Sequence, residues 1–164
     1  MTETKFETNG NQLTVTRIFN ASIDLVWRTW TEADLLDQWW APKPWESKTK
    51  RMTFEENGQR LYAMCGPKGE EHWGLTTYEI INKPSVFTGE DAFCDTNGNV
   101  NEEMPVAKFE NKFHSTSTQT TVTVVTQYAS EEHLKQVIQM GMKEGLSMAY
   151  ENLDNLLINL KGQK

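Results

Sequence analysis

Alternating apolar and polar positions predict a β-strand over residues 12–19. Leu13, Val15 and Phe19 share one parity, and the threonines between them share the other. Such a period of two is typical of a strand that buries one face. Arg17 falls on the apolar parity and interrupts it.

The next segment predicts two short helices. Ser22 has the chemistry of an N-cap, and the apolar side of the first helix includes Trp30. Thr31 followed by Asp34 resembles a capping box that opens the second helix. The proline-containing run 41–45 ends the helical region, because proline lacks an amide donor and restricts the residue before it.

Short runs of strand-forming residues separated by turn signals then predict the rest of a sheet. We expect strands over residues 46–55, 59–65, 72–81, 86–93, 106–114 and 120–128. Asn57-Gly58 favours the positive φ angles of a tight hairpin, and the polar run 95–103 indicates an exposed, mobile loop. With the first strand, the total is about seven.

The last part of the chain predicts one long helix over about residues 130–160. Ser130 supplies an N-cap, and Glu131 and Glu132 suit the positive end of the helix dipole. Apolar residues recur at helical spacing: Leu134, Ile138, Met142, Ala149, Leu153, Leu156 and Leu160. Such a helix is about 45 Å long and must pack on the sheet. We therefore predict an α+β domain in which a curved antiparallel sheet of six or seven strands wraps around this helix.

The predicted domain spans residues 1–164, with 12–160 as its folded core and 1–11 as an N-terminal extension. A net charge of -7 disfavours nucleic acid as a partner, because phosphate binding depends on clustered lysines and arginines. The sequence has neither a long apolar run nor a basic segment leading into one, so we predict no membrane insertion and a cytoplasmic location. Cys65 and Cys94 are expected to be reduced.

Several local motifs together resemble one known family. They are RIFNAS at residues 17–22, LDQWWAP at 36–42, YAMCGPKG at 62–69, GLTTYEI at 74–80, MKEG at 142–145 and LDNL at 153–156. The chain resembles the START-like (SRPBCC) helix-grip superfamily and, within it, the activator of heat-shock protein 90 ATPase homologue-like family. This resemblance implies a helix-grip fold with an apolar cavity between the sheet and the C-terminal helix.

Rigid aromatic faces and flexible thioethers suit a cavity that holds a small apolar molecule. The predicted ligand-binding residues are Trp39, Trp40, Trp45, Met64, Trp73, Phe87, Phe93, Met142, Gly145 and Ala149. Ordinary core packing is the alternative for the aromatic and methionine side chains. Gly141 and Gly145 are expected inside the long helix, either to make room for a ligand or to allow close approach to the sheet.

Catalytic chemistry is the weaker expectation, and no residue is assigned to it. Cys65 and His72 flank a hairpin turn and would form a thiolate pair if they faced one another. An inward carboxylate from Glu79, Glu90 or Asp91 with a raised pKa would serve as a general base, although a solvated face is the simpler interpretation. The three histidines lack metal-ligand spacing, so we predict no metal and no cofactor.

Three functions follow from these observations, in order of expectation. The first is binding of a small hydrophobic or amphipathic molecule, which predicts a closed cavity with few ionisable groups. The second is a small cyclase or hydrolase, which predicts convergent polar residues in the cavity and a perturbed pKa among them. The third is an interaction module of the co-chaperone type, whose partner is a chaperone or another protein and whose core is filled. A monomer and a homodimer are both compatible with the sequence.

Overall fold

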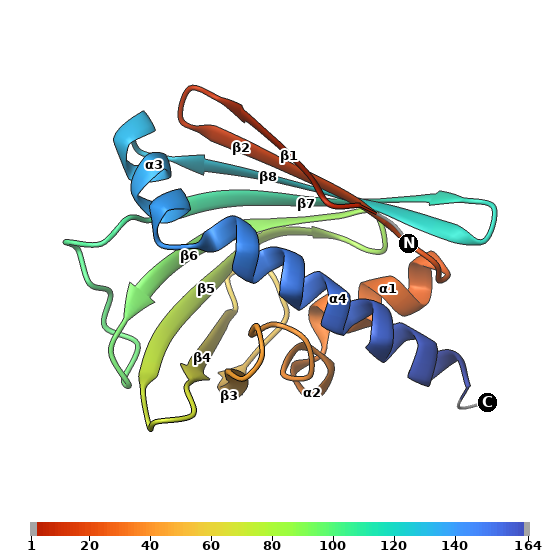
Figure 1. Ribbon diagram of the computed structural model, residues 1–164, viewed down its shortest axis with the longest axis horizontal. Coiled ribbons are helices and arrows are strands. Elements are labelled where there is room, and N and C mark those ends of the chain that lie inside the picture. The colour runs from red at the N-terminus through yellow and green to blue at the C-terminus, as the bar shows by residue number, and fades with distance from the viewer. Residues whose placement is uncertain (1–2, 163–164) are drawn as a thin grey trace.

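The structure is a computed structural model that describes residues 3–162 and contains one antiparallel sheet with helices against it (Figure 1). The elements in chain order are β1 (Lys5–Asn9), β2 (Gln12–Phe19), α1 (Ile23–Thr31), α2 (Ala33–Leu36), β3 (Glu46–Met52), β4 (Gln59–Cys65), β5 (Glu71–Asn82), β6 (Val86–Cys94), β7 (Ala107–Thr116), β8 (Gln119–Tyr128), α3 (Glu131–Gln139) and α4 (Met142–Lys161). The predicted α+β helix-grip architecture is confirmed.

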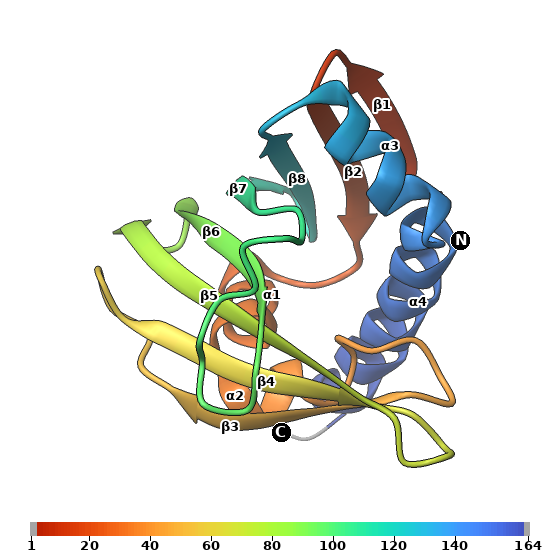
Figure 2. The same cartoon turned by 90° about the vertical axis from the view of Figure 1, so that its left-hand side faces the viewer.

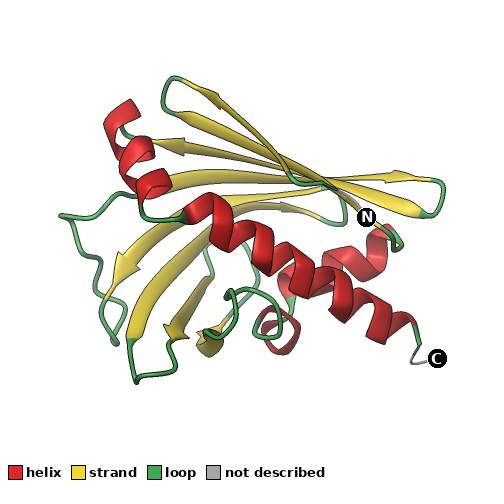
Figure 3. Cartoon of the chain, viewed as in Figure 1, coloured by secondary structure: helices red, strands yellow, loops and turns green. Residues whose placement is uncertain are grey.

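The sheet has eight strands in the order β1-β2-β8-β7-β6-β5-β4-β3. Its strands curl into a trough, and α4 crosses the open, concave side (Figure 2). All the helices lie on that side, as the colouring by secondary structure shows (Figure 3). The side chains that point into the trough therefore determine whether the space between the sheet and α4 is filled or open.

The sheet begins earlier than predicted. Residues expected to be an N-terminal extension form β1, which pairs antiparallel with β2 from Lys5 opposite Thr16 to Asn9 opposite Gln12. The strand is mostly exposed, with Phe6 as its half-buried apolar residue. Such an edge strand lacks the apolar alternation that identified the other strands, which is why the predicted count of about seven was too low.

The prediction of one unbroken helix over residues 130–160 was wrong. Helix α3 ends at Gln139, and α4 begins at Met142. Gly141 lies between them with φ of 92°, a left-handed conformation that a residue without a Cβ adopts readily. The apolar spacing is continuous across this break, so periodicity alone did not reveal it. The 20 residues of α4 still form the long helix of the fold.

The two serine caps were predicted correctly, and the capping box was not. The Ser22 hydroxyl accepts a hydrogen bond from the backbone N–H of Leu25, and Ser130 accepts one from His133. Thr31 instead belongs to α1, where its hydroxyl donates to the carbonyl oxygen of Trp27. The second short helix therefore starts without a side-chain cap.

Arg17, the charged residue on the apolar parity of β2, ties the sheet to the helix. It is buried, and its guanidinium forms a 2.5 Å ion pair with Asp154 of α4. One end of the trough, beneath α1, is filled by aromatic packing: the ring of Trp27 lies 5.5 Å from that of Phe87 and 5.1 Å from that of Phe113. The other end, toward α3, is not filled in this way.

Candidate functional site

A cavity of about 280 Å³ lies between the concave face of the sheet and the first half of α4. From α4 it is lined by Met142, Leu146 and Tyr150, which recur every four residues and so lie on one side of the helix. Most of the sheet residues that line it share one parity within their strand, with Trp73 of β5 and Ala92 of β6 as the exceptions, and apolar side chains dominate the wall. The cavity is therefore a product of the same alternation that predicts the strands.

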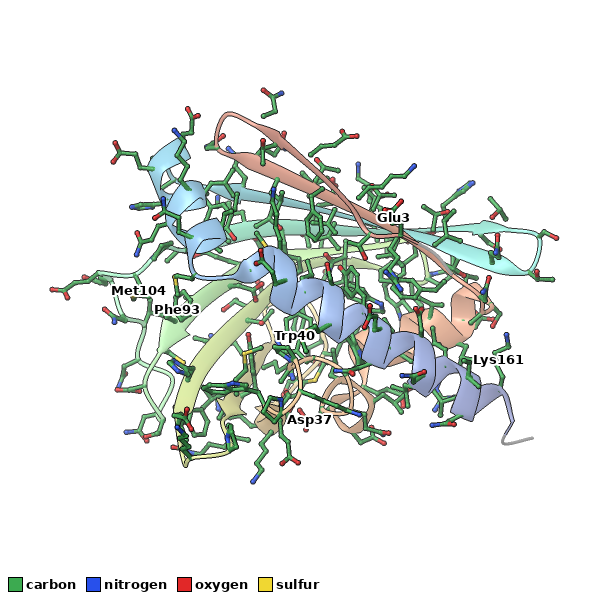
Figure 4. All side chains as sticks on the ribbon, in the orientation of Figure 1. Glu3, Asp37, Trp40, Phe93, Met104 and Lys161 are labelled. Atoms are coloured by element: carbon green, nitrogen blue, oxygen red, sulfur yellow. The ribbon has the colours of Figure 1, made fainter. Side chains whose placement is uncertain are left out.

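Six of the ten predicted ligand-binding residues line this cavity. They are Trp40, Met64, Trp73, Phe87, Phe93 and Met142. Figure 4 shows Trp40 below α4 and Phe93 at the end of β6, so the two mark different parts of the space. The structure thus brings together side chains from a loop, three strands and the helix that lie up to about a hundred residues apart in the chain.

The other four predicted residues lie elsewhere. Trp39 is buried in the core, where its indole N–H donates a 2.8 Å hydrogen bond to the carbonyl oxygen of Thr29. Ala149 is also buried in the core. Trp45 packs with its ring 5.3 Å from that of His72, which itself lines the cavity, so Trp45 is one layer removed from it.

Gly145 does not make space in the cavity. A Cβ built on it would meet Cγ of Pro42 at 3.6 Å, an ordinary van der Waals distance, and the residue is not part of the cavity wall. Gly141 serves the turn between α3 and α4 instead of lying inside a helix. Neither of the two explanations offered for helix glycines, ligand space or close approach to the sheet, fits the positions that they occupy.

Asp91 places a carboxyl group in this largely apolar wall. It lies on the same parity of β6 as Phe87 and Phe93, and its Oδ1 accepts a 2.5 Å hydrogen bond from the hydroxyl of Thr76 on β5. Burial raises the pKa of this carboxyl to about 6, while the Thr76 hydrogen bond and the charge of Arg60 act in the opposite direction. Asp91 therefore titrates near pH 6, well above the usual range of an aspartate.

Burial and the negative charge of Asp91 raise the pKa of three tyrosines, which are neutral. Burial raises the pKa of Tyr62 and of Tyr128 to about 12 and that of Tyr78 further, and Asp91 adds to each shift. All three line the cavity. They present phenolic groups to its contents at any physiological pH.

Arg60 forms a flat, charged part of the wall on β4. Its side chain is 2% exposed, and its guanidinium lies 4.1 Å from the ring centroid of Tyr62 and 5.2 Å from that of Trp40. The group donates hydrogen bonds to Thr49 and Ser47 and pairs with Asp37 at 3.3 Å. Asp37, which is labelled in Figure 4, is therefore the counter-charge of this guanidinium.

Two further polar atoms of cavity residues are buried without a hydrogen-bond partner among residues 3–162. They are Oδ1 of Asn111 on β7 and the indole N–H of Trp30 on α1. Asn111 is 6% exposed and Trp30 is 4% exposed. Buried polar atoms are usually paired, because an unpaired one costs about 1–3 kcal/mol.

Of these polar residues, the sequence had singled out Asp91 alone. Asn111 falls between Phe109 and Phe113 on the inward parity of β7, and Arg60 falls on the inward parity of β4. A polar residue at an inward position was the signal available for both. Glu90, by contrast, lies on the opposite face, where the register pairs it with Thr77 and Lys108.

The strand register separates Cys65 from His72. Met64 is the partner of His72 and Cys65 is the partner of Glu71, so the thiol and the imidazole point to opposite faces of the sheet. The thiolate pair that would have required them to face one another is therefore not formed. Both cysteines are free in the structure. Within residues 3–162 no three histidine, cysteine or acidic side chains gather as metal ligands, and no described helix is long and apolar enough to span a membrane.

Comparison with known proteins agrees with the fold. A family model described as "Activator of Hsp90 ATPase homolog 1-like protein" matches residues 20–158. A solution structure of a protein from Arthrobacter aurescens is similar with a TM-score of 0.88 and 26% identity, covering 94% of this chain and 91% of that one. The crystal structure of protein Ms6760 from Mycobacterium smegmatis is similar with a TM-score of 0.85 and 30% identity, covering 94% and 95%. No curated protein matches the sequence.

Proposed function

Because the chain belongs to the family of Activator of Hsp90 ATPase homolog 1-like proteins, and its trough encloses an unfilled space, we propose that it binds a small, mostly apolar molecule between the sheet and α4. The observation that carries this proposal is the cavity of about 280 Å³ with walls from both the sheet and the helix. A ligand that buries about 200 Å² of apolar surface there gains roughly 5 kcal/mol before the costs of association.

The unfilled cavity favours ligand binding over the interaction module, for which we expected a filled core. The large apolar side chains that are exposed lie on several elements: Ile80 on β5, Val100 in the loop after β6, Met140 between α3 and α4, and Met148 and Ile158 on α4. No single element therefore presents a long apolar stripe of such residues within the described chain. A chaperone or other protein partner receives no specific support from these positions.

A cavity-filling substitution tests the proposal. Leu146→Trp places a larger side chain on the cavity side of α4 and should weaken binding of the fluorescent apolar probe 1-aminoanthracene at least tenfold. Ile158→Trp is the matched control, because Ile158 lies on the same helix and is 67% exposed. Met142→Trp repeats the test from a second position in case the first variant does not fold.

Native mass spectrometry of freshly purified protein complements the probe. We expect a co-purified molecule that is lost from Leu146→Trp and retained by Ile158→Trp. Equal probe binding by the two folded variants would show that the probe occupies another place. An absence of both probe binding and co-purified molecules in the unmodified protein would defeat the proposal.

An enzymatic function is the second candidate, and Asp91 is the observation that favours it. A carboxyl with a pKa of about 6 beside Thr76 meets the expectation for a general base in the cavity. The reaction class would be removal of a proton next to a carbonyl group by Asp91 and return of that proton to another atom of the same molecule. Incubating the recovered ligand with protein in D₂O tests this, because proton abstraction would introduce deuterium at carbon in the unmodified protein and not in Asp91→Asn. A ligand that stays free of deuterium would leave binding as the function.

A further inference from the structure

Most of the cavity wall is apolar. Three polar atoms of the wall residues have no hydrogen-bond partner in the described part of the chain, and they include both acceptors and a donor. Two of the three are acceptors: the carboxyl of Asp91, whose Oδ2 receives no side-chain hydrogen bond within residues 3–162, and Oδ1 of Asn111. The third, the indole N–H of Trp30, is a donor. A purely hydrocarbon ligand would leave the second oxygen of Asp91 unpaired, which is unfavourable for a buried acceptor.

We infer that the ligand is an apolar molecule that carries an N–H or O–H group, that this group donates a hydrogen bond to Asp91, and that the site disfavours carboxylates. This inference rests on the proposed function and specifies the chemistry of its ligand. It follows from the position of Asp91 on the inward parity of β6, held from one side by Thr76 and open to the cavity on the other.

In the part of the chain that the structure describes, no unpaired cation of the cavity wall neutralises the charge of Asp91, so a ligand would have to supply the group that pairs with it. Arg60 on β4 is the cation near it, and that guanidinium is already paired with Asp37 at 3.3 Å. Glu90 adds a second negative charge from the opposite face of β6. A ligand carboxylate would bring another negative charge into a wall of low dielectric, whereas an ammonium or hydroxyl group would pair with the acceptor.

Among residues 3–162, no other element of the cavity wall supplies a charge that would replace the ligand's donor. The residues of α4 on the cavity wall are Met142, Leu146 and Tyr150, and β7 places Ala107 opposite Asp91. Strands β5, β4 and β8 contribute Tyr78, Tyr62 and Tyr128, which are neutral. His72 on β5 lies four positions along that strand from Thr76, the register partner of Asp91, and is exposed.

Asp91 and Asn111 lie at different places along the cavity wall. Asn111 is opposite Phe87 on β6, four residues before Asp91. At about 3.3 Å per residue, the two positions are roughly 13 Å apart along the strand. The aromatic wall of the cavity lies between them, which suits a flat apolar body with its donor at the Asp91 end.

Four naphthalene probes with one common body test the inference by isothermal titration calorimetry. They are 1-naphthylmethylamine, 1-naphthalenemethanol, the methyl ether of that alcohol, and 1-naphthylacetate. We expect the alcohol to bind about tenfold more tightly than its methyl ether, which cannot donate, and the carboxylate to bind most weakly. Affinity for the amine should rise about tenfold from pH 5 to pH 7.5, because the ammonium pairs with the ionised form of Asp91.

Asp91→Asn should remove both the pH dependence and the penalty on the carboxylate, whereas Glu90→Gln, the neighbouring carboxylate on the outer face, should retain the pH dependence and most of the penalty. If the probes bind but the alcohol and the ether bind equally, the inference fails and the proposed function stands. If no probe binds and Leu146→Trp changes nothing, the proposed function itself fails. Should Asp91→Asn not fold, the comparison of alcohol and ether in the unmodified protein decides the question.

Discussion

The hydroxyl of Thr76 donates a 2.5 Å hydrogen bond to Oδ1 of Asp91 across the pairing of β5 and β6. This bond favours the ionised carboxyl and opposes the effect of burial on its pKa. With a pKa of about 6, the Asp91 carboxyl changes between its protonated and ionised forms just below neutral pH. A ligand that donates to the other oxygen would shift the balance further toward the ionised form.

Removing that hydrogen bond gives the first prediction. Thr76→Val keeps the shape of the side chain and loses the donor, so the pKa of Asp91 should rise above its value of about 6 in the unmodified protein. Carbon-detected NMR titration of the Asp91 carboxyl would measure both midpoints. Thr77→Val, a substitution on the adjacent residue of β5 that faces away from Asp91, should leave the midpoint unchanged. An unchanged or lowered midpoint in Thr76→Val would contradict the prediction.

The raised pKa of Asp91 also predicts how stability depends on pH. The carboxyl ionises near pH 4 in the unfolded chain and near pH 6 in the folded protein, so between these values the folded state holds the extra proton. The free energy of unfolding should therefore be largest at the acidic end of this window and fall as pH rises through 6. Asp91→Asn cannot ionise and avoids that loss, which amounts to about 1–3 kcal/mol.

Urea unfolding at pH 5 and pH 8 measures this effect. Asp91→Asn should be more stable than the unmodified protein at pH 8, and the difference should shrink at pH 5. Glu90→Gln is the matched control on the outer face of the same strand and should not reproduce the change with pH. A difference between Asp91→Asn and the unmodified protein that is the same at both pH values would show that burial does not perturb the carboxyl.

Much of the fold could be predicted because its determinants are local. The alternation in β2 and the serine caps of α1 and α3 are properties of a few neighbouring residues, and the structure agrees with them. The helix break is different. It depends on one residue, Gly141, whose positive φ ends α3 and begins α4. The spacing of apolar residues does not reveal this conformation. Strand β1 was missed because an exposed edge strand needs little apolar surface.

The candidate site could be predicted in part, from residue type. Large aromatic and methionine side chains line a cavity often enough that six of ten predicted residues do so here. Which of two adjacent tryptophans faces the cavity is decided by the short segment after α2, and the structure turns Trp40 toward it and Trp39 into the core. The roles of Asn111 and Arg60 depend on strand register and on partners distant in the sequence, such as Asp37.

The ion pair of Arg60 and Asp37 predicts a large cost when one partner is removed. Asp37→Ala deletes the counter-charge and the acceptor of Ser47 and Thr49, and leaves a guanidinium that is 2% exposed without its anion. We expect a loss of about 3 kcal/mol in the free energy of unfolding. Glu32→Ala, which removes the partner of Arg28 from an exposed pair at the C-terminal end of α1, should cost less than about 1 kcal/mol. Equal losses in the two variants would show that burial of Arg60 does not set the cost.

The two glycines before and within α4 give the last prediction, because their backbones differ. Gly145 lies in the helix, and a Cβ there would meet Pro42 at 3.6 Å without strain. Alanine is a better helix former than glycine, so Gly145→Ala should raise the free energy of unfolding by about 0.5–1 kcal/mol. Gly141 has φ of 92°, where a Cβ is strained whatever space surrounds it. Gly141→Ala should therefore lower the free energy of unfolding by about 1 kcal/mol or more.

Thermal and urea unfolding of both variants, with 1-aminoanthracene binding measured on the same samples, separates backbone strain from cavity effects. Gly145→Ala should bind the probe as the unmodified protein does, because Gly145 is not part of the cavity wall. Gly141→Asn provides a further comparison, since asparagine tolerates the left-handed region better than alanine and should recover part of the lost stability. If Gly145→Ala instead lost probe binding with unchanged stability, Gly145 would have to be regarded as part of the ligand site. Equal destabilisation by Ala and Asn at position 141 would argue that its neighbours, and not its φ angle, require glycine.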